Sequence, residues 1–239
     1  MNCATWNVCG LASPSRLRIV KQWAKKRQEH LKVLMLQELR CKERDAKFCL
    51  NQLAEQGSYM VDYTEEGKAG AALIFRRNWK ILAGGRRGDG TAAWMKARTE
   101  LGDIGFTSVH GPRDRSSRAR LWKWLAEICA EGVWILGGDW NSVETWEDSV
   151  GESPIQRGTE QRRWNDLAAQ LDLADAWTEA TSRCGPHFTR QRQFGERFDQ
   201  ARLDRVYFRR SETWAGKCIH VKHDEQISLS DHHPVFLSI

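Results

Sequence analysis

The sequence predicts an α/β fold around one large core, with strands that belong to antiparallel or mixed sheets. The chain has 239 residues, 41% hydrophobic and 28% charged, enough to bury a core of that size. Apolar residues recur at helical spacing in some segments and in short strand-like runs in others. Several consecutive strand signals are joined by short turns, unlike the strict strand–helix alternation of a parallel sheet. No linker, repeat or low-complexity segment divides the chain, so we expect a single domain over 1–239.

The first half of the chain is expected to alternate strands with helices and then to continue as strands. Ser13-Pro14 opens a helix, because proline is favoured at the first helical turn. An apolar run that ends in the polar pair Gln37-Glu38 suits a strand buried on both faces. The expected strands cover 2–8, 30–37, 59–63, 70–75, 79–83, 91–98 and 104–110, and the expected helices cover 13–27 and 42–56.

The second half is expected to add two long helices and the remaining strands. Ser116 or Ser117 caps a helix that runs to Glu131, and a further helix covers 159–171. A hairpin is expected to pair 187–192 with 202–208, and the other expected elements are 133–136, 173–178, 218–222 and 235–239. The polar stretch 142–158 is expected to be a solvated loop with exposed acids, namely Glu144, Glu147, Asp148 and Glu152.

Composition narrows the class of protein. The formal net charge of +6 suits an anionic partner, although many basic proteins bind none. The seven cysteines are odd in number and contain no CxxC pair, and the N-terminus has no secretory pattern. We therefore expect reduced thiols in an intracellular protein, without a zinc site. No apolar run approaches the length needed to span a membrane.

Polar side chains sit at the ends of six expected strands. A single example is best explained as a turn, but six with the same kinds of residue are better explained by one shared site. Asp139 and Asn141 follow two glycines, which let the backbone turn tightly, and they project to the same side if the chain stays extended. The strand-end residues are Asn7, Glu38, His110, Asp139 with Asn141, Asp204, and Asp231 with His232.

The sequence motifs around these residues resemble those of a known protein family. In chain order, TWNVCG, LMLQEL, SVHGP, GGDWN, RLDRVYF and LSDHHPV resemble the motifs of the endonuclease/exonuclease/phosphatase superfamily, and the resemblance runs from Thr5 to Leu237. It implies a four-layered α/β sandwich of two packed mixed β-sheets flanked by helices. GGDWNSVETWEDSVGESP and LDLADAWTE are most similar to the endonuclease domains of LINE-type (non-LTR) retrotransposons.

The resemblance also implies a metal site. Glu38 would be the main ligand of a divalent metal, with Asn7 and Asp231 beside it. Hard carboxylate and amide oxygens suit Mg²⁺, which keeps several waters and meets the substrate phosphate, and Mn²⁺ is expected to substitute.

The remaining catalytic roles follow from the same resemblance. Asp139 would orient or deprotonate the attacking water, Asn141 would bind a phosphoryl oxygen, and His232 would donate to the scissile phosphate. Asp204 would hold the His232 imidazole and favour its charged form. The pancreatic-type enzymes also have a histidine at the position of His110, paired with an acid on a neighbouring strand. The matching strand 70–75 contains no acid, so His110 acts either as an acid or only as a phosphate contact.

Two segments are candidates for binding DNA. Arg113, Arg115 and Arg118 lie near an expected helix N-terminus, where a phosphate-facing loop and a solvated polar face are equally good explanations. The family places its groove-probing hairpin over 190–194, where arginine and glutamine suit phosphates or base edges and phenylalanine suits a base step. An ordinary charged hairpin is the alternative. The candidate hairpin residues are Arg190, Gln191, Arg192 and Phe194.

These observations lead us to expect a Mg²⁺-dependent endonuclease that nicks one strand of double-stranded DNA. The nick would leave a 3′ hydroxyl that primes retrotransposon reverse transcription, which implies a monomeric nuclear protein fused to a reverse transcriptase. The alternatives are an abasic-site repair endonuclease, a phosphomonoesterase of the same superfamily, and a binding domain without catalysis. The aromatic residues that wall the abasic-sugar pocket are replaced at the best-matching positions, Arg190 and Ala201, which argues against abasic-site repair.

Overall fold

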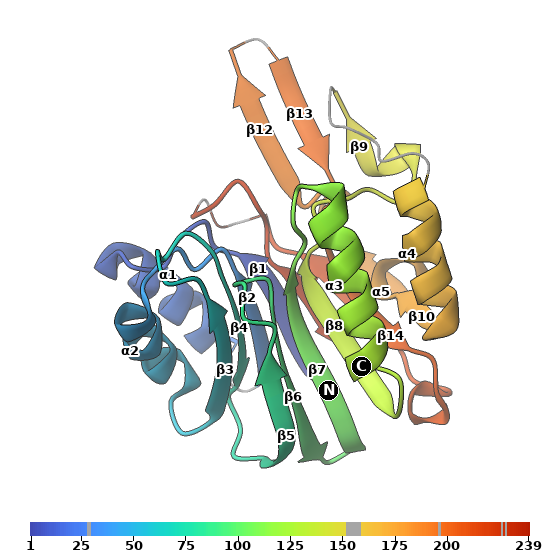
Figure 1. Ribbon diagram of the computed structural model, residues 1–239, viewed down its shortest axis with the longest axis horizontal. Helices are drawn as coiled ribbons and strands as arrows, with labels where there is room; N and C mark the ends of the chain where they lie inside the picture. Colours follow the sequence, from blue (N-terminus) through green and yellow to red (C-terminus); the bar gives the residue numbers. More distant parts are fainter. Residues whose placement is uncertain (28–29, 152–158, 196, 226, 228) are drawn as a thin grey trace.

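Two β-sheets pack face to face, and helices cover the outer face of each (Figure 1). The computed structural model describes residues 1–27, 30–151, 159–195, 197–225, 227 and 229–239. The resulting four layers confirm the expected α/β sandwich of two mixed sheets flanked by helices.

The first sheet has seven strands and contains the N-terminal strand at its centre. β1 pairs in parallel with β2 and antiparallel with β16, because the chain crosses over through a helix before β2 and returns from the far end to β16. In spatial order the strands are β11 (Ser182–Cys184), β15 (His220–His223), β16 (Val235–Ser238), β1 (Asn2–Asn7), β2 (Val33–Gln37), β4 (Gly70–Phe75) and β3 (Ser58–Tyr63).

The second sheet has six strands, of which β7 and β8 are parallel. β14 runs antiparallel to β8, so the start of β14 lies beside the end of β8. In spatial order the strands are β10 (Leu173–Asp175), β14 (Asp204–Arg209), β8 (Val133–Asp139), β7 (Gly102–His110), β6 (Ala92–Thr99) and β5 (Lys80–Arg86).

Three apolar cores separate the four layers. α1 (Pro14–Lys25) and α2 (Glu43–Ala54) pack on the first sheet, around buried residues that include Trp6 and Leu50. Met35 and Phe106 belong to the core between the sheets. α3 (Arg115–Ile128) and α4 (Thr159–Gln170) pack on the second sheet around several tryptophans. Among the described residues, no helix is both long enough and apolar enough to cross a membrane.

A small third sheet projects beyond the two large ones (Figure 1). It consists of the hairpin β12 (Arg190–Phe194) and β13 (Arg197–Ala201), with the two-residue strand β9 (Ser149–Val150) beside β13. The short elements are α5 (Ala176–Glu179) and the 3₁₀ turns Trp146–Asp148 and Glu212–Trp214. The expected pairing of 187–192 with 202–208 was wrong, because 204–209 joins β8 and β10 in the second sheet.

Other local expectations also need correction. Asp114, not Ser116 or Ser117, caps α3, and its carboxylate accepts from the Ser117 N–H at 2.8 Å. Gly137 and Gly138 do not form a turn but lie inside β8. A Cβ on Gly138 would lie 1.9 Å from the Val109 carbonyl oxygen, so glycine there allows β7 and β8 to approach.

The loop after β8 is not a wholly solvated segment either. Asp148 is 1% exposed and its side chain is the centre of a buried polar cluster. Glu147 is exposed, whereas Glu152 lies outside the described residues. The expectation of exposed acids therefore fails for Asp148, because two buried arginines require a carboxylate partner there.

Strand direction brings the polar strand ends together. β1 and β2 are parallel, as are β7 and β8. A hydrogen bond between Asn7 at the end of β1 and Asp139 at the end of β8 places the ends of both pairs at one edge of the sandwich. Antiparallel β14 and β16 begin at that edge, with Asp204 opposite Asp139 and Val235 opposite Thr5. The site predicted from six separate strand ends is thus assembled from both sheets.

Candidate active site

Glu38, His110 and Asp139 form a cluster at this edge. One potential ligand atom from each lies within 4.8 Å of the others, and His110 Nε2 is 3.4 Å from Glu38 Oε1. Glu38 follows β2 of the first sheet, whereas His110 and Asp139 end β7 and β8 of the second. The acid partner that β4 does not provide for His110 is therefore Glu38 itself.

The loop that carries Glu38 has an unusual backbone. Glu38 and Arg40 both have left-handed φ angles, 53° and 47°, which non-glycine residues adopt only when other contacts hold them. The Glu38 carbonyl accepts from the Gly10 N–H at 2.7 Å, and the buried Leu39 donates its N–H to the Gly70 carbonyl at 3.1 Å. These bonds fix the direction in which the Glu38 carboxylate points.

Glu38 is held in its ionised form. Burial raises the pKa of its carboxyl, but the hydrogen bond and charge of His110 outweigh burial. An ion pair with Arg40 adds to this effect, and the pKa falls to about 2. Glu38 is thus a carboxylate throughout the neutral range, as a metal ligand must be.

Asp139 is shared between two groups of residues. Its Oδ2 accepts from Asn7 Nδ2 at 2.8 Å, and its Oδ1 accepts from the Asn141 N–H at 2.9 Å. The Asn7 Oδ1 accepts from the Cys9 N–H at 3.0 Å. In this arrangement Asn7 presents a donor to the site and orients Asp139, and its own oxygen is engaged with the backbone.

His232 lies behind Asp139 and in front of Asp204. Its Nδ1 is 2.8 Å from Asp204 Oδ2, its Nε2 is 3.9 Å from Asp139 Oδ2, and the side chain is 3% exposed. Burial lowers the pKa of His232, but the charges of Asp204 and Asp139 outweigh burial and raise the pKa to about 9. His232 is therefore a buried imidazolium whose Nε2 proton faces the first cluster.

Asp231 is near the site but has other partners. It forms an ion pair with Arg192 of β12, and the Cys9 thiol donates to its Oδ1 at 3.3 Å. Burial raises the pKa of the Cys9 thiol to about 12, so the thiol stays protonated and can donate. Asp231 belongs to neither of the two ligand clusters found among the described residues.

Asn141 is oriented differently from the expectation. Its φ angle is 47°, so the chain does not stay extended after β8 and the side chains of Asp139 and Asn141 are not simply parallel. The Asn141 Nδ2 donates to the Gly111 carbonyl at 2.9 Å. This bond joins the turn after β8 to the turn after β7, which supports the position of His110.

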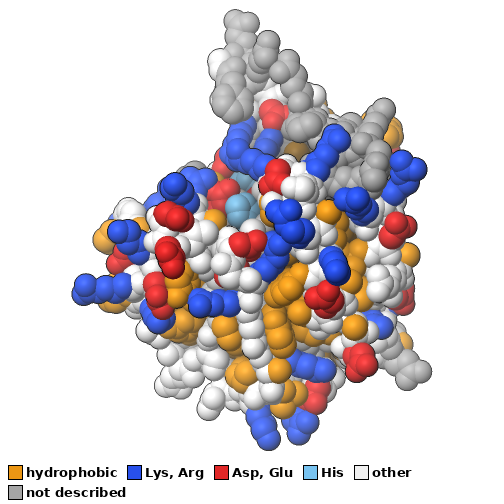
Figure 2. All heavy atoms as spheres, in the orientation of Figure 1, with side chains coloured by type: hydrophobic (Ala, Val, Ile, Leu, Met, Phe, Trp, Pro, Cys, Tyr) orange, Lys and Arg blue, Asp and Glu red, His pale blue; other side chains and the backbone are white. Residues whose placement is uncertain are grey.

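The expected DNA-contacting arginines fall into different environments. Arg118 is 1% exposed and donates to the Asn141 carbonyl at 2.8 Å and the Arg113 carbonyl at 3.2 Å. Its assignment to DNA was wrong, because a guanidinium buried against backbone carbonyls cannot face a ligand outside. Arg113 and Arg115 are exposed at the start of α3. Basic and acidic side chains surround a visible histidine on this face (Figure 2).

The hairpin candidates also differ from one another. Arg190 pairs with Asp199 across the hairpin, and Arg192 pairs with Asp231. Gln191 is half-buried, and its N–H donates to the Asp231 carbonyl at 2.9 Å. The side chain of Phe194 lies outside the described residues, so its expected role stays a prediction.

The first cluster has the chemistry of a divalent metal site. Glu38 and Asp139 supply carboxylate oxygens, which Mg²⁺ and Mn²⁺ prefer, and His110 adds an imidazole nitrogen. All three side chains are buried or half-buried, so a cation would offset the repulsion between the two carboxylates. The residues present therefore fit the expected ion.

Sequence reasoning missed three supporting residues. Arg40 pairs with Glu38, and Thr189 Oγ1 accepts from the Leu203 and Asp204 N–H groups at 3.0 and 2.9 Å. Asp148 organises the loop behind the hairpin. Arg40 could have been suspected from its charge two residues after Glu38. The other two depend on long-range pairing that no local pattern reveals.

Comparisons with known proteins agree with this architecture. The sequence profile of the Endonuclease/Exonuclease/phosphatase family matches residues 4–232. Among curated proteins, none matches the chain by sequence. An AP endonuclease from Archaeoglobus fulgidus has a similar fold, with 14% identity, a TM-score of 0.72, and 100% of this chain and 99% of that chain covered.

Two other solved structures are similar over nearly their whole length. The endonuclease domain of TRAS1, a telomere-specific non-LTR retrotransposon, has 16% identity and a TM-score of 0.68, with 100% of this chain and 97% of that chain covered. A family protein from Leptotrichia buccalis C-1013-b has 18% identity and a TM-score of 0.68, with 100% and 99% covered. At these identities the likeness concerns the fold alone.

Proposed function

Because the chain belongs to the endonuclease/exonuclease/phosphatase family, we propose that it is a divalent-metal-dependent endonuclease that nicks one strand of double-stranded DNA. The observation that carries the proposal is the meeting of two groups around Asp139. Glu38 and His110 lie on one side of it, and the buried His232–Asp204 pair lies on the other. A phosphodiester placed there would meet carboxylates for a metal and an imidazolium for its developing charge.

The proposed chemistry follows from the protonation states. His232 carries its proton on Nε2 and donates it as a hydrogen bond to a phosphoryl oxygen as charge builds there. Asp204 holds Nδ1 and keeps the imidazole charged. Asp139 orients the attacking water, aided by Asn7 and the Asn141 N–H, which fix its two oxygens. A divalent metal, most simply Mg²⁺ held by Glu38 with Asp139 and His110, would supply positive charge to the phosphate.

DNA is the preferred substrate because of the surface around the site. Arg113 and Arg115 are exposed in the segment that follows His110, and Arg192 of the hairpin pairs with Asp231, the residue before His232. Arg190 and Ala201 face each other across the hairpin, and neither is aromatic. This supports an intact strand over an abasic sugar as the target.

The proposed role in retrotransposition is supported by the sequence motifs and by the similar fold of the TRAS1 domain. We propose that the nick leaves a 3′ hydroxyl for target-primed reverse transcription. The domain would then work in the nucleus as a monomer, fused to a reverse transcriptase.

A plasmid assay tests the proposal. Supercoiled DNA incubated with the protein and Mg²⁺ should become relaxed circles, and EDTA should prevent this. Asp139→Ala and His232→Ala should each lower the nicking rate by roughly 10²- to 10³-fold, the size of other electrostatic deletions. Asp103→Ala is the matched control, because Asp103 is exposed at the opposite end of β7 from His110. Equal nicking by all variants would rule the site out.

The same assay separates the alternatives. A duplex oligonucleotide with one abasic-site analogue, compared with the intact duplex, measures preference for damage. A strong preference for the analogue would support abasic-site repair instead. Release of inorganic phosphate from inositol phosphates, without any nicking, would support a phosphomonoesterase.

A further inference from the structure

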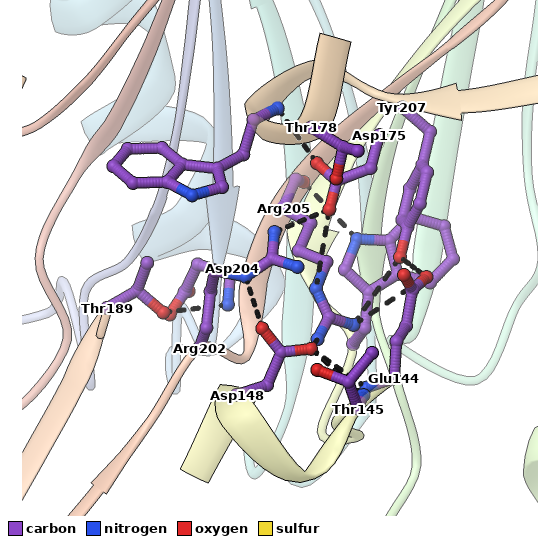
Figure 3. A network of polar contacts seen from close by, with 12 residues as sticks. Glu144, Thr145, Asp148, Asp175, Thr178, Thr189, Arg202, Asp204, Arg205 and Tyr207 are labelled. Carbon is purple, nitrogen blue, oxygen red and sulfur yellow. Dashed lines mark hydrogen bonds and ion pairs between the residues drawn. The ribbon is translucent and has the colours of Figure 1, made fainter. Parts of the chain in front are cut away.

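Buried acidic and basic side chains form a polar cluster (Figure 3), and its loop pairs with β13 of the hairpin. Asp148 is at its centre, with its Oδ1 2.6 Å from Arg202 Nε and its Oδ2 2.9 Å from Arg205 Nη2. Arg202 also pairs with Asp175. Despite burial, which raises the pKa of Asp148, His187 and the two arginines lower it well below the usual range. Asp148 is therefore a permanent buried anion.

Asp148 forms hydrogen bonds within its own loop as well as ion pairs with the arginines. Its Oδ2 accepts from the Glu144 and Thr145 N–H groups at 3.2 and 3.1 Å. Its carbonyl accepts from the Arg202 N–H at 2.8 Å. The next two residues form β9, which pairs with Gln200 and Ala201 of β13. One side of the hairpin is thus tied to the loop 144–150 through Asp148.

The other strand of the hairpin is hydrogen-bonded to the segment 231–233, which contains His232. The Gln191 N–H donates to the Asp231 carbonyl at 2.9 Å, and the His233 N–H donates to the Thr189 carbonyl at 2.7 Å. Arg190 and His232 form an antiparallel bridge between these bonds. The backbone of His232 is therefore an extension of the same small sheet.

Asp204 is connected to the same structure. Its N–H and that of Leu203 donate to Thr189 Oγ1, at the foot of β12. Arg202, which Asp148 holds, lies two residues before Asp204 along the chain. Movement of Asp148 and Arg202 would thus shift β13, Asp204 and the segment 231–233 together.

We infer that Asp148 is a positioning residue that sets the position of the β12–β13 hairpin relative to His232. It would thereby couple the choice of DNA target to catalysis. This inference rests on the proposed function for its DNA substrate. Asp148 lies outside both ligand clusters, so it would act on catalysis through its partners, chiefly Arg202, Arg205 and the loop that ends in β9. Asp148→Asn keeps the size of the side chain but removes one of the anions that neutralise the two buried guanidinium groups.

The decisive measurement is the distribution of nick positions along one plasmid. A variant that merely folds less well would nick the same positions at a lower total rate. Loss of positioning should instead change which positions are nicked, and should lower the rate at saturating DNA by up to about 100-fold, as a displacement of about 1 Å does. Asp148→Asn is compared with Asp172→Asn, because Asp172 is exposed on the surface and pairs only with exposed Arg210 among its described ion pairs.

A second variant guards against failure to fold. Val150→Pro removes a backbone donor from β9 without burying a charge, since Val150 is 52% exposed. Val150→Pro should also redistribute the nicks. An unchanged distribution in both folded variants would overturn the inference.

Hydrogen exchange gives a readout that does not depend on activity. In the metal-free protein without DNA, Asp148→Asn should speed exchange at the Gln191 and His233 amides by at least about tenfold, because both bonds belong to the tied sheet. Unchanged exchange at both amides would also contradict the coupling. If the wild type fails to nick DNA, the proposed function fails, whereas the exchange experiment still tests the coupling by itself.

Discussion

His232 is the side chain whose chemistry depends most on its neighbours, and Asp204 is the neighbour that can be changed most cleanly. Asp204→Asn keeps the shape of the side chain but removes its charge from Nδ1. The pKa of His232, raised to about 9 by Asp204 and Asp139, should then fall by more than about one unit. NMR titration of the imidazole in the metal-free protein measures this shift. An unchanged His232 titration would contradict the assignment.

The same pair gives a stability effect whose sign is fixed. The folded pKa of His232 lies above the ordinary value of 6.5, so its contribution to stability is fully present below pH 6.5. That contribution is lost as pH rises through about 9. The loss between pH 7 and 9.5 should be smaller in Asp204→Asn than in the wild type.

At this scale the sequence predicted which side chains lie together better than how they are oriented. Glu38, His110, Asp139 and His232 were expected at one site because strand ends of the same kind recur and match family motifs, and the structure brings these side chains together. Their catalytic and metal-binding roles stay predictions. The turn at Asn141 could not be predicted, because its left-handed backbone depends on the Gly111 contact across two strands.

Around the start of α3, six residues contain both a structural arginine, Arg118, and two candidate DNA contacts, Arg113 and Arg115. Arg113 and Arg115 are exposed, so Arg113→Gln and Arg115→Gln should each weaken DNA binding and reduce the salt slope by about 0.9 for each phosphate that the arginine neutralises. Arg118→Gln should leave the slope unchanged and lower stability, because it removes the buried guanidinium that donates to two backbone carbonyls. Titration of a fluorescent duplex at several salt concentrations, with urea unfolding of each variant, measures both effects. A lower salt slope in Arg118→Gln would restore its assignment to DNA.

The elements themselves were predicted well where periodicity is local. The apolar runs of β2 and β4 and the amphipathic pattern of α1 and α2 are visible in the chain, and each forms near its expected bounds. The hairpin was mispaired because both 197–201 and 204–209 have strand character, and only tertiary packing decides which one pairs with β12. β14 is buried on both faces beside β8, whereas β13 lies in the projecting sheet.

The four-layer arrangement was predicted from the resemblance of the sequence motifs to the family, because composition and periodicity alone predicted only an α/β class. Buried charge was the part of the molecule that no pattern predicted. Asp148, Arg202 and Arg205 have the residue types of a solvated surface, and they are buried only because each neutralises another.

The stability of the folded protein at acid pH should depend on His223, which has no role in the proposed active site. His223 of β15 is 2% exposed, stacks on Trp177 at 4.0 Å, and donates from Nδ1 to the Pro186 carbonyl at 2.6 Å. Burial lowers its pKa to about 3, although the bond to Pro186 acts in the opposite direction. The folded pKa is thus below the unfolded value near 6.5, so the stability present above pH 6.5 is lost as pH falls toward 3.

Urea unfolding of the metal-free protein at pH 7, 6 and 5 measures the loss. His223 alone should lower the unfolding free energy by about 2 kcal/mol between pH 6.5 and 5, at about 1.4 kcal/mol per pH unit. His232 adds no slope in this window, because it is protonated in both states below pH 6.5. His223→Gln keeps a donor for Pro186 but cannot take up the proton, so its stability should depend less on pH. If the unfolding free energy of the variant depends on pH as steeply as that of the wild type, another group controls the loss of stability at acid pH. His233 is one such group, because partial burial also lowers its pKa.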